Sequence, residues 1–240
     1  MRFYQIDIIA KLSESASGWS CLITGASRGI GAALAVRLAK PGRTIGINYS
    51  SSDEAALAVA KKVEERGARA LLLKADLSNP TEVDSMFARL PDRLDVLVCN
   101  AFPAPRYARL HETPIEEFER QWRVGALGAA LCCRKALPGM LKRKTGRVVF
   151  VVTSAAEGAA PGYLGAYVSA KYALLGLARA VEAEAGPRGV KVACAFPGMT
   201  DTDMIKGFPH PVVDAAREAA GKLSTPAEVA ETIAALVEAA

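Results

Sequence analysis

Six short apolar runs alternate with longer segments of helical pattern, and this alternation constrains the fold more than any other feature of the sequence. The runs are SCLIT (20–24), RTIGIN (43–48), ALLLKA (70–75), LDVLVC (94–99), RVVFVV (147–152) and VKVACAF (190–196). They lack the polar alternation of half-exposed strands, so we expect six strands that are covered on both faces.

Helical segments are expected between these runs, at 29–39, 53–66, 80–88, 114–141 and 163–185. Parallel strands need crossover connections, and right-handed crossovers place helices on both faces of the sheet. The predicted fold class is therefore α/β: a single-domain Rossmann fold with a doubly wound parallel sheet of six, or at most seven, strands. We expect residues 1–17 to be an N-terminal extension and residues 18–240 to be the domain.

Composition excludes several classes of protein. The net charge of +5 is mild, and its densest run is too short for the basic stripe of a nucleic-acid site. The five cysteines contain no CxxC pair and the chain has two histidines, so we expect no metal site. Cysteines in apolar surroundings indicate reduced thiols and a cytoplasmic protein. No apolar stretch has the length of a membrane span or the pattern of a signal peptide.

A glycine-rich turn, TGASRGIG (24–31), joins the first predicted strand to the first predicted helix. Glycines there allow a tight turn and close approach of the backbone to a pyrophosphate, which the helix N-terminus binds through unpaired N–H groups. Its place at the start of a βαβ unit makes nucleotide binding the favoured interpretation. The candidate cofactor-binding residues are Gly25, Ser27, Arg28, Gly29, Ile30 and Gly31.

The end of the second predicted strand favours NADP(H) over NAD(H). An NAD site carries an acidic residue about 20 residues beyond the glycine turn, where it binds the ribose hydroxyls. Here Asn48, Tyr49 and Ser50 occupy that place and no carboxylate would repel a 2′-phosphate. Arg28 and the serine hydroxyls could bind the phosphate instead.

The order and spacing of the motifs resemble the short-chain dehydrogenase/reductase family, including its 3-oxoacyl-acyl-carrier-protein reductases. TGASRGIG resembles the family's TGxxxGxG, ADLS (75–78) its adenine contact, CNAF (99–102) its NNAG, YVSAK (167–171) its YxxxK, and PGMTDTDM (197–204) its segment beside the nicotinamide. The resemblance implies an oxidoreductase with further cofactor contacts at Asp76, Leu77, Asn100, Ala101, Tyr167, Lys171, Pro197, Gly198, Thr200 and Thr202.

The candidate catalytic residues are Ser154, Tyr167 and Lys171. A free tyrosine has a pKa of about 10, and a lysine four residues further along a helix shares its face and can lower that value. Tyr167 would then act as general acid or base. Ser154 lies 13 residues before Tyr167, at the end of a predicted strand, where its hydroxyl could polarise the substrate oxygen.

The sequence departs from the family pattern in three places. Gly125 stands where the family has an active-site Asn that holds a water linking the Lys to solvent. Cys99 and Phe102 replace the first Asn and the Gly of NNAG, and no apolar run remains after 196 for a seventh strand. These departures keep a second hypothesis open, an NADP(H)-binding sensor or weakly active protein.

The substrate is expected to be a small molecule with a carbonyl or secondary alcohol group. Residues 199–223 should form an irregular lid, because glycines and prolines interrupt them. Met199, Met204, Ile205 and Phe208 indicate an apolar pocket. A 3-oxoacyl thioester, a steroid, a sugar and a small ketone all remain open.

The family habit implies a homodimer or homotetramer. The charge pattern and the short apolar stretches imply no nucleic-acid or membrane partner.

Overall fold

The computed structural model describes residues 18–158 and 160–239, so the predicted extension at 1–17 lies outside the described residues. Its strands are β1 (Ser20–Ile23), β2 (Thr44–Tyr49), β3 (Arg69–Lys74), β4 (Val96–Cys99), β5 (Gly146–Val151) and β6 (Val190–Ala195). All pair in parallel in the order β3-β2-β1-β4-β5-β6. The predicted doubly wound α/β sheet is confirmed, and the described residues contribute no seventh strand to it.

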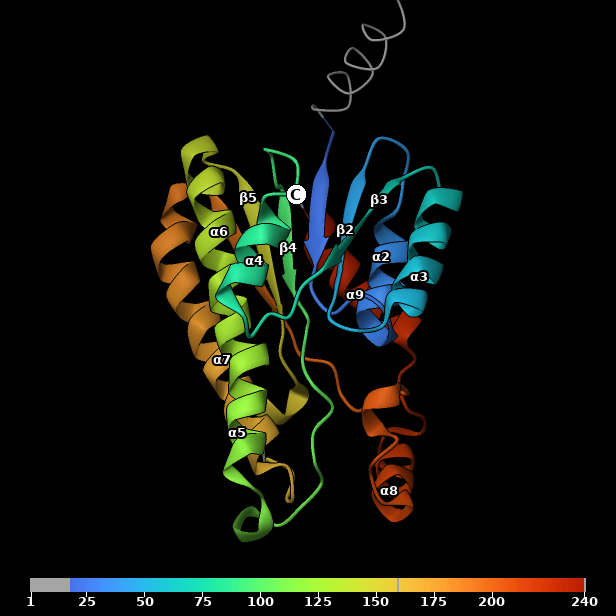
Figure 1. The fold of residues 1–240 in the computed structure, drawn as a ribbon. Coiled ribbons are helices and arrows are strands. Elements are labelled where there is room, and N and C mark those ends of the chain that lie inside the picture. Colours follow the sequence, from blue (N-terminus) through green and yellow to red (C-terminus); the bar gives the residue numbers. More distant parts are fainter. Residues whose placement is uncertain (1–17, 159, 240) are drawn as a thin grey trace, which may run out of the picture.

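Helices cover both faces of the sheet (Figure 1). They are α2 (Gly29–Leu38), α3 (Asp53–Glu65), α4 (Pro80–Phe87), α5 (Ile115–Gln121), α6 (Gly128–Arg143), α7 (Gly165–Ala185), α8 (His210–Ala220) and α9 (Pro226–Glu238). Helices α2, α3 and α9 pack on one face, and α4, α6 and α7 pack on the other. This three-layer arrangement buries the apolar side chains of every strand.

Alternation along each strand divides the core into two halves. Val96 and Val98 of β4 belong to the half beneath α2, α3 and α9, whereas Leu97 and Cys99 belong to the half beneath α4, α6 and α7. Since successive side chains of a strand point to opposite faces, a run that is apolar throughout supplies both halves at once. This explains why the strands were recognisable as unbroken apolar runs.

The strand order reverses between β1 and β4, and this reversal positions the site. Strands β2 and β3 lie on one side of β1, and the chain then crosses over so that β4 pairs with β1 on its other side. The connections at the carboxyl ends of β1 and β4 therefore diverge to opposite faces and leave a crevice between them, where open α/β sheets bind ligands.

The expected single helix at 114–141 is interrupted by a π-helical segment. Residues Trp122–Leu127 form this segment, which joins α5 to α6. A π-helical turn adds a residue to the usual repeat and is frequent at functional sites. By length and composition alone the whole stretch Ile115–Arg143 could cross a bilayer, but the inner side chains of α6 pack on the sheet.

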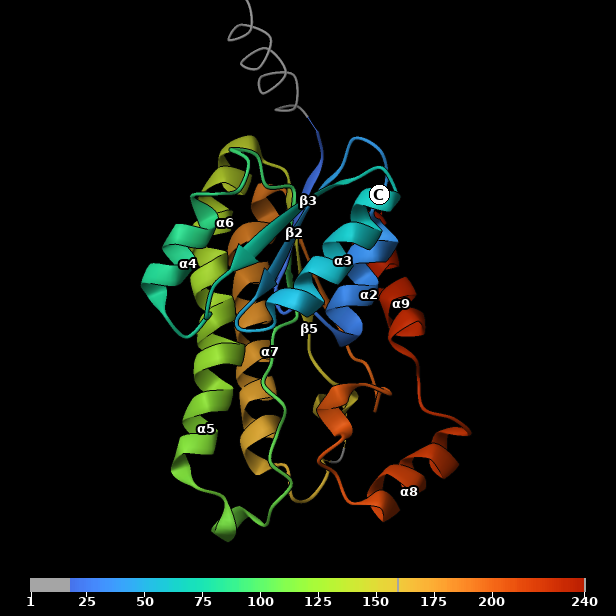
Figure 2. The same cartoon turned by 45° about the vertical axis from the view of Figure 1, so that its right-hand side comes forward.

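The segment 199–223 is more regular than expected, because it contains the helix α8. Pro209 precedes this helix, Pro211 lies in its first turn, and Gly221, with a φ of 75°, follows its end. Figures 1 and 2 show α8 beyond the carboxyl ends of the strands, and none of its residues is buried. The expectation of irregular structure here was therefore wrong, since prolines and glycines mark the ends of this helix.

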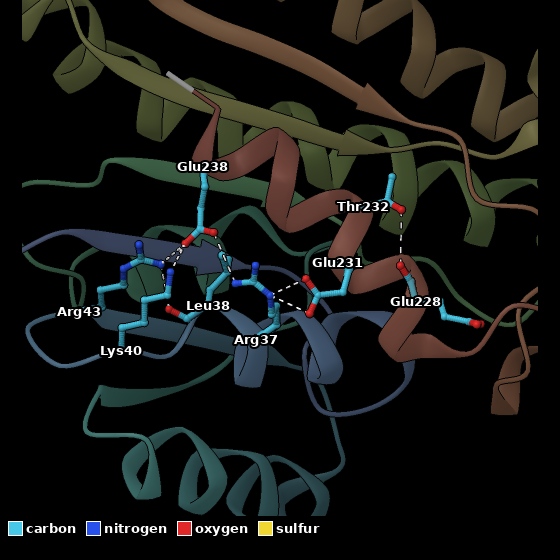
Figure 3. Close-up of polar contacts among 8 residues, drawn as sticks. All are labelled: Arg37, Leu38, Lys40, Arg43, Glu228, Glu231, Thr232 and Glu238. Atoms are coloured by element: carbon cyan, nitrogen blue, oxygen red, sulfur yellow. Dashed lines mark hydrogen bonds and ion pairs between the residues drawn. The ribbon is translucent and has the colours of Figure 1, made fainter.

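A cluster of charges holds the C-terminal helix α9 against α2 (Figure 3). Glu238 accepts hydrogen bonds from Lys40 at 2.7 Å, Arg43 at 2.9 Å and Arg37 at 3.4 Å. Arg37 also donates to both oxygens of Glu231, at 2.7 and 2.8 Å. The hydrogen bond from Lys40 is the main reason that the pKa of Glu238 falls to about 2. This network fixes α9 to the helix that begins at the glycine turn.

Candidate active site

Two adjoining cavities occupy the crevice at the carboxyl ends of the strands. The first, of about 750 Å³, runs from the glycine turn along the ends of β2 and β3. The second, of about 350 Å³, lies between α7 and the segment after β6. Both are lined by Ile30, Asn100, Phe102, Thr202 and Met204. A ligand in one cavity can therefore reach a ligand in the other.

Nearly all of the site residues predicted from the sequence line these two cavities. The first cavity is lined by Gly25, Ser27, Arg28, Gly29, Ile30, Asn48, Tyr49, Ser50, Asp76, Leu77, Asn100, Ala101 and Thr202. The second is lined by Ile30, Asn100, Ser154, Tyr167, Lys171, Pro197, Gly198, Thr200 and Thr202. Gly31 lines neither and lies buried behind the turn.

The glycine turn has the geometry that a dinucleotide pyrophosphate requires. Gly25 and Gly29 have φ values of 63° and 56°, which other residues rarely adopt. A Cβ at Gly31 would lie 2.6 Å from the carbonyl oxygen of Gly25, so only glycine lets α2 pack on the turn. No side chain caps the start of α2 at Arg28, so the first N–H groups of that helix are available to phosphate oxygens.

Two asparagines brace this turn from behind. Asn48 is buried, accepts a hydrogen bond from the Gly25 N–H at 3.1 Å and donates to the carbonyls of Leu73 and Ala75. Asn100 donates from Nδ2 to the carbonyl of Thr24 at 2.9 Å. The bracing therefore persists although Cys99 and Phe102 replace the neighbouring motif residues.

Thr24 is a structural partner that the sequence reasoning missed. Its hydroxyl oxygen accepts hydrogen bonds from the backbone N–H groups of Asn100 at 2.9 Å and Ala101 at 3.0 Å. The hydroxyl also donates to the carbonyl of Val98 at 3.1 Å. These bonds join β1 to the end of β4. The available signal was the threonine that opens the TGxxxGxG pattern.

Near the end of β2, both the cation Arg28 and the carboxylate Asp53 have partners of opposite charge. Arg28 hydrogen-bonds to the Ser52 side chain, lies 3.9 Å from Asp203 and is more than half exposed. Asp53 accepts hydrogen bonds from Lys74 at 2.7 Å and from the Tyr49 hydroxyl at 3.0 Å. The Lys74 bond is the main reason that the pKa of Asp53 is lowered. Asp53 is thus paired with Lys74, while Arg28 lines the first cavity together with Ser50, Ser51 and Ser52.

Ser154, Tyr167 and Lys171 meet in the second cavity. Ser154 opens a short 3₁₀ turn after β5, and its N–H donates to the Pro197 carbonyl at 3.0 Å. Tyr167 and Lys171 are one turn apart on α7. The Lys171 ammonium is buried and donates to the Val151 carbonyl at 2.8 Å. A hydroxyl, a phenol and an amine thus converge beside the dinucleotide-shaped cavity.

A family model described as short chain dehydrogenase matches residues 20–211. The chain belongs to the short-chain dehydrogenase family. It is 35% identical over 190 residues to a 3-oxoacyl-[acyl-carrier-protein] reductase of Synechocystis, covering 78% of this chain and 76% of that protein. It is 34% identical over 218 residues to cis-4-hydroxycyclohexanecarboxylate dehydrogenase of Sinomonas cyclohexanicum, covering 89% and 86%.

A solved short-chain dehydrogenase from Burkholderia cenocepacia, in complex with NADP, shares the whole fold. The two chains superpose with a TM-score of 0.81 and 31% sequence identity, over 93% of this chain and 91% of the other. The likeness is thus to short-chain dehydrogenases as complete domains, and the neighbour's nicotinamide cofactor agrees with the cradle at the glycine turn.

The electrostatics of this short-chain dehydrogenase differ from the sequence expectation at Tyr167. Burial raises the pKa of the phenol, and a hydrogen bond with the Thr153 hydroxyl opposes that rise. Burial also lowers the pKa of Lys171, to about 7. Lys171 is only partly charged at neutral pH, so the expected lowering of the phenol's pKa is not found. The sequence showed the spacing of the two residues but not their burial, and it missed Thr153.

Much of the second cavity is apolar, although Asn100, Thr153, Thr200 and Thr202 also line it. Its wall includes Met199, Met204, Ile205 and Phe208 from the segment after β6, as predicted, together with Ala155, Pro161 and Leu164 from the opposite side. Among the described residues that line it, Lys171 is the one with a formal charge. The cavity therefore suits an uncharged group.

Three aromatic rings join the loops around this cavity. Tyr107 stacks on Tyr163 with ring centroids 5.0 Å apart and lies 5.5 Å from Phe208. Tyr163 has a φ of 66° and precedes α7, so the predicted helix at 163–185 begins two residues late. Within residues 18–158 and 160–239, no group of three or more His, Cys, Asp or Glu side chains could hold a metal ion.

Proposed function

We propose that the protein is an NADP(H)-dependent reductase of carbonyl compounds or dehydrogenase of secondary alcohols. The observation that carries this proposal is the convergence of Ser154, Tyr167 and Lys171 in a cavity that adjoins the dinucleotide cradle. Gly25, Gly29 and the start of α2 would hold the pyrophosphate, and Asp76 and Leu77 would face the adenine.

A nicotinamide cofactor held by these residues would supply the hydride for a carbonyl carbon, or accept one from an alcohol. In the reducing direction, Tyr167 donates its phenolic proton to the substrate oxygen as negative charge develops there. Ser154 donates a hydrogen bond to the same oxygen. The Lys171 ammonium then stabilises the phenolate that remains on Tyr167. Burial supports the first step, since it keeps the phenol protonated until the substrate oxygen accepts the proton.

Cofactor preference gives a direct prediction. NADPH should raise the melting temperature more than NADH at equal concentration, because Arg28 and the adjacent serines can bind a 2′-phosphate. Arg28→Ala should weaken NADPH binding about tenfold or more and leave NADH binding nearly unchanged. Calorimetric titration of both cofactors measures the effect.

Arg66→Ala is the matched control, because Arg66 is an exposed residue at the end of α3 and lines neither cavity. It should leave both affinities unchanged. Stronger binding of NADH than of NADPH by the wild-type protein would contradict the preference for NADP(H).

The apolar cavity points to an uncharged carbonyl or alcohol group as the reacting part of the substrate. The related proteins are named for a 3-oxoacyl-acyl-carrier-protein and for a hydroxycyclohexanecarboxylate, so both linear and cyclic compounds belong in a test. Turnover with a panel of ketones, 3-oxoacyl thioesters and secondary alcohols, with NADPH or NADP⁺, tests the proposal.

A second candidate function is a cofactor-binding sensor with little catalysis. Gly125 and Phe102, at positions where the family has Asn and Gly, favour it, since position 125 has no side chain to hold a water between Lys171 and solvent. Clear cofactor binding without turnover of any compound in the panel would support the sensor and contradict the reductase.

We further propose a cytoplasmic homodimer or homotetramer. Helices α5 to α7 expose large apolar side chains outside the core, with Trp122 48%, Leu127 57% and Tyr172 46% accessible. Such residues on two long neighbouring helices suit a symmetric contact between copies. Sedimentation velocity should give the mass of two or four chains, and Leu127→Glu should reduce it. A wild-type mass of one chain would contradict this assembly.

The five free cysteines, four of them buried, agree with a reducing compartment.

A further inference from the structure

The ring of Phe102 lies between Gly125 and Lys171. Phe102 follows β4, Gly125 belongs to the π-helical segment Trp122–Leu127, and Lys171 is on α7. The ring lines both cavities and therefore stands where the cofactor and substrate spaces meet. The side chain of Phe102, at the end of β4, thus contacts both the π-helical segment and α7.

The ring and the glycine fit one another as a pair. A Cβ at position 125 would lie 2.5 Å from both Cε atoms of Phe102 and closer still to its Cζ, so the ring occupies the space that a side chain there would need. The ring is also held on its other sides: its centroid lies 5.8 Å from that of Tyr167, with the planes at 76°. It cannot make room for a side chain at 125 without leaving its present neighbours.

The face of the same ring receives the buried ammonium of Lys171. Nζ lies 3.7 Å from the ring centroid and donates one hydrogen bond, to the Val151 carbonyl. Burial lowers the pKa of Lys171, and no charged side chain among residues 18–158 and 160–239 contributes to that change. Besides the titratable Tyr167 on its own helix, this amine faces the neutral Phe102 and the hydroxyls of the second cavity.

We propose that Phe102 is a positioning residue for proton transfer, whose ring face holds the Lys171 ammonium beside Tyr167 by a cation–π contact, and that Gly125 is required to seat the ring. A desolvated ammonium over an aromatic face is stabilised by the ring quadrupole. The role of the contact in turnover rests on the proposed reductase function. The two departures from the family motif, at 102 and 125, then belong together. The ring of Phe102 supports Lys171 in place of the asparagine that the family has at position 125.

The first test measures the ionisation of Lys171 without any turnover. In the cofactor-free protein with carbon-13-labelled lysine, NMR titration follows the Lys171 side chain, which Lys171→Met identifies by the loss of its signal. Phe102→Leu keeps an apolar side chain but removes the ring face, and should lower the pKa of Lys171 by about one unit. Phe118→Leu, on α5 and outside both cavities, should leave it unchanged. An unchanged or raised value in Phe102→Leu would overturn the proposal.

The second test measures the coupling between positions 102 and 125. Gly125→Asn should lower both the melting temperature and turnover, because the new side chain displaces the ring. Adding Phe102→Gly to Gly125→Asn should restore turnover about tenfold relative to Gly125→Asn alone and raise the melting temperature again. Effects that simply add would overturn the pairing. An inactive wild-type protein would refute the reductase function, while the NMR titration would still decide the contact.

Discussion

Replacing Tyr167 with phenylalanine should lower turnover by at least about a hundredfold while leaving cofactor binding unchanged. The substitution removes one hydroxyl group, which is the proton donor of the proposed reaction, and keeps the ring that packs 5.8 Å from Phe102. The glycine turn and the ends of β2 and β3, which form the first cavity, are untouched. Steady-state turnover of the best substrate from the panel, together with a calorimetric titration of NADPH, measures both effects.

Tyr163→Phe is the matched control. Tyr163 lies four residues before Tyr167, outside α7, where its ring stacks on Tyr107, and it does not line the second cavity. Its hydroxyl has no part in the proposed proton transfer, so turnover should remain close to that of the wild type. Full activity of Tyr167→Phe would refute the role given to the phenol.

Replacing Lys171 with methionine should have two effects of opposite sign. Turnover should fall by about a hundredfold or more, because the phenolate of Tyr167 loses the cation that stabilises it. The free energy of unfolding should rise by about 1–4 kcal/mol, the range observed when a buried ionic group is replaced by an apolar side chain of similar volume. Methionine is unbranched and of similar volume, and no charged group has to lose its hydration when it is buried on folding.

The gain in stability should depend on pH in a defined window. The pKa of Lys171 is about 7 in the folded protein and 10.5 in the unfolded chain. Between these values the unfolded chain binds more protons, so the wild-type protein gains stability as the pH rises, and Lys171→Met does not. The stability advantage of Lys171→Met over the wild type should be complete below pH 7 and vanish near pH 10.5.

Urea unfolding of both proteins from pH 6 to pH 10.5 measures this difference. A pH-independent advantage would show that Lys171 is not the group whose ionisation is linked to folding. In the reducing direction, the wild-type turnover should also fall as the pH passes through the pKa of Lys171, since the neutral amine no longer stabilises the phenolate.

The sheet and the cofactor cradle were predictable because local sequence determines them. A short apolar run such as VVFVV, between a glycine and a serine, favours a strand that is covered on both faces. The glycines of the turn between strand and helix mark the positions where the structure has positive φ angles. Helix α8 was missed because prolines and glycines interrupt regular structure but also mark the two ends of a helix. Pro211 lies in its first turn and Gly221 follows its last residue.

The electrostatics of the site were not predictable because they depend on burial. The spacing of Tyr167 and Lys171 shows that they share a helix face, but whether the lysine is charged depends on the strand and loop that cover it. The contact of Phe102 with Gly125 joins residues 23 positions apart in the sequence, and only the π-helical turn brings the glycine against the ring.

The reciprocal fit of ring and glycine also limits how the sequence can change over evolutionary time. A side chain gained at 125 collides while the ring is present, and a ring lost at 102 leaves Lys171 without its aromatic face. Each single step is therefore disfavoured, and lineages that carry one arrangement will tend to keep it. Considered separately, Phe102 and Gly125 look like two unrelated losses of residues from the family motif. Considered together, they form one complementary contact that also reaches Lys171, so an intact motif is not needed for an organised site.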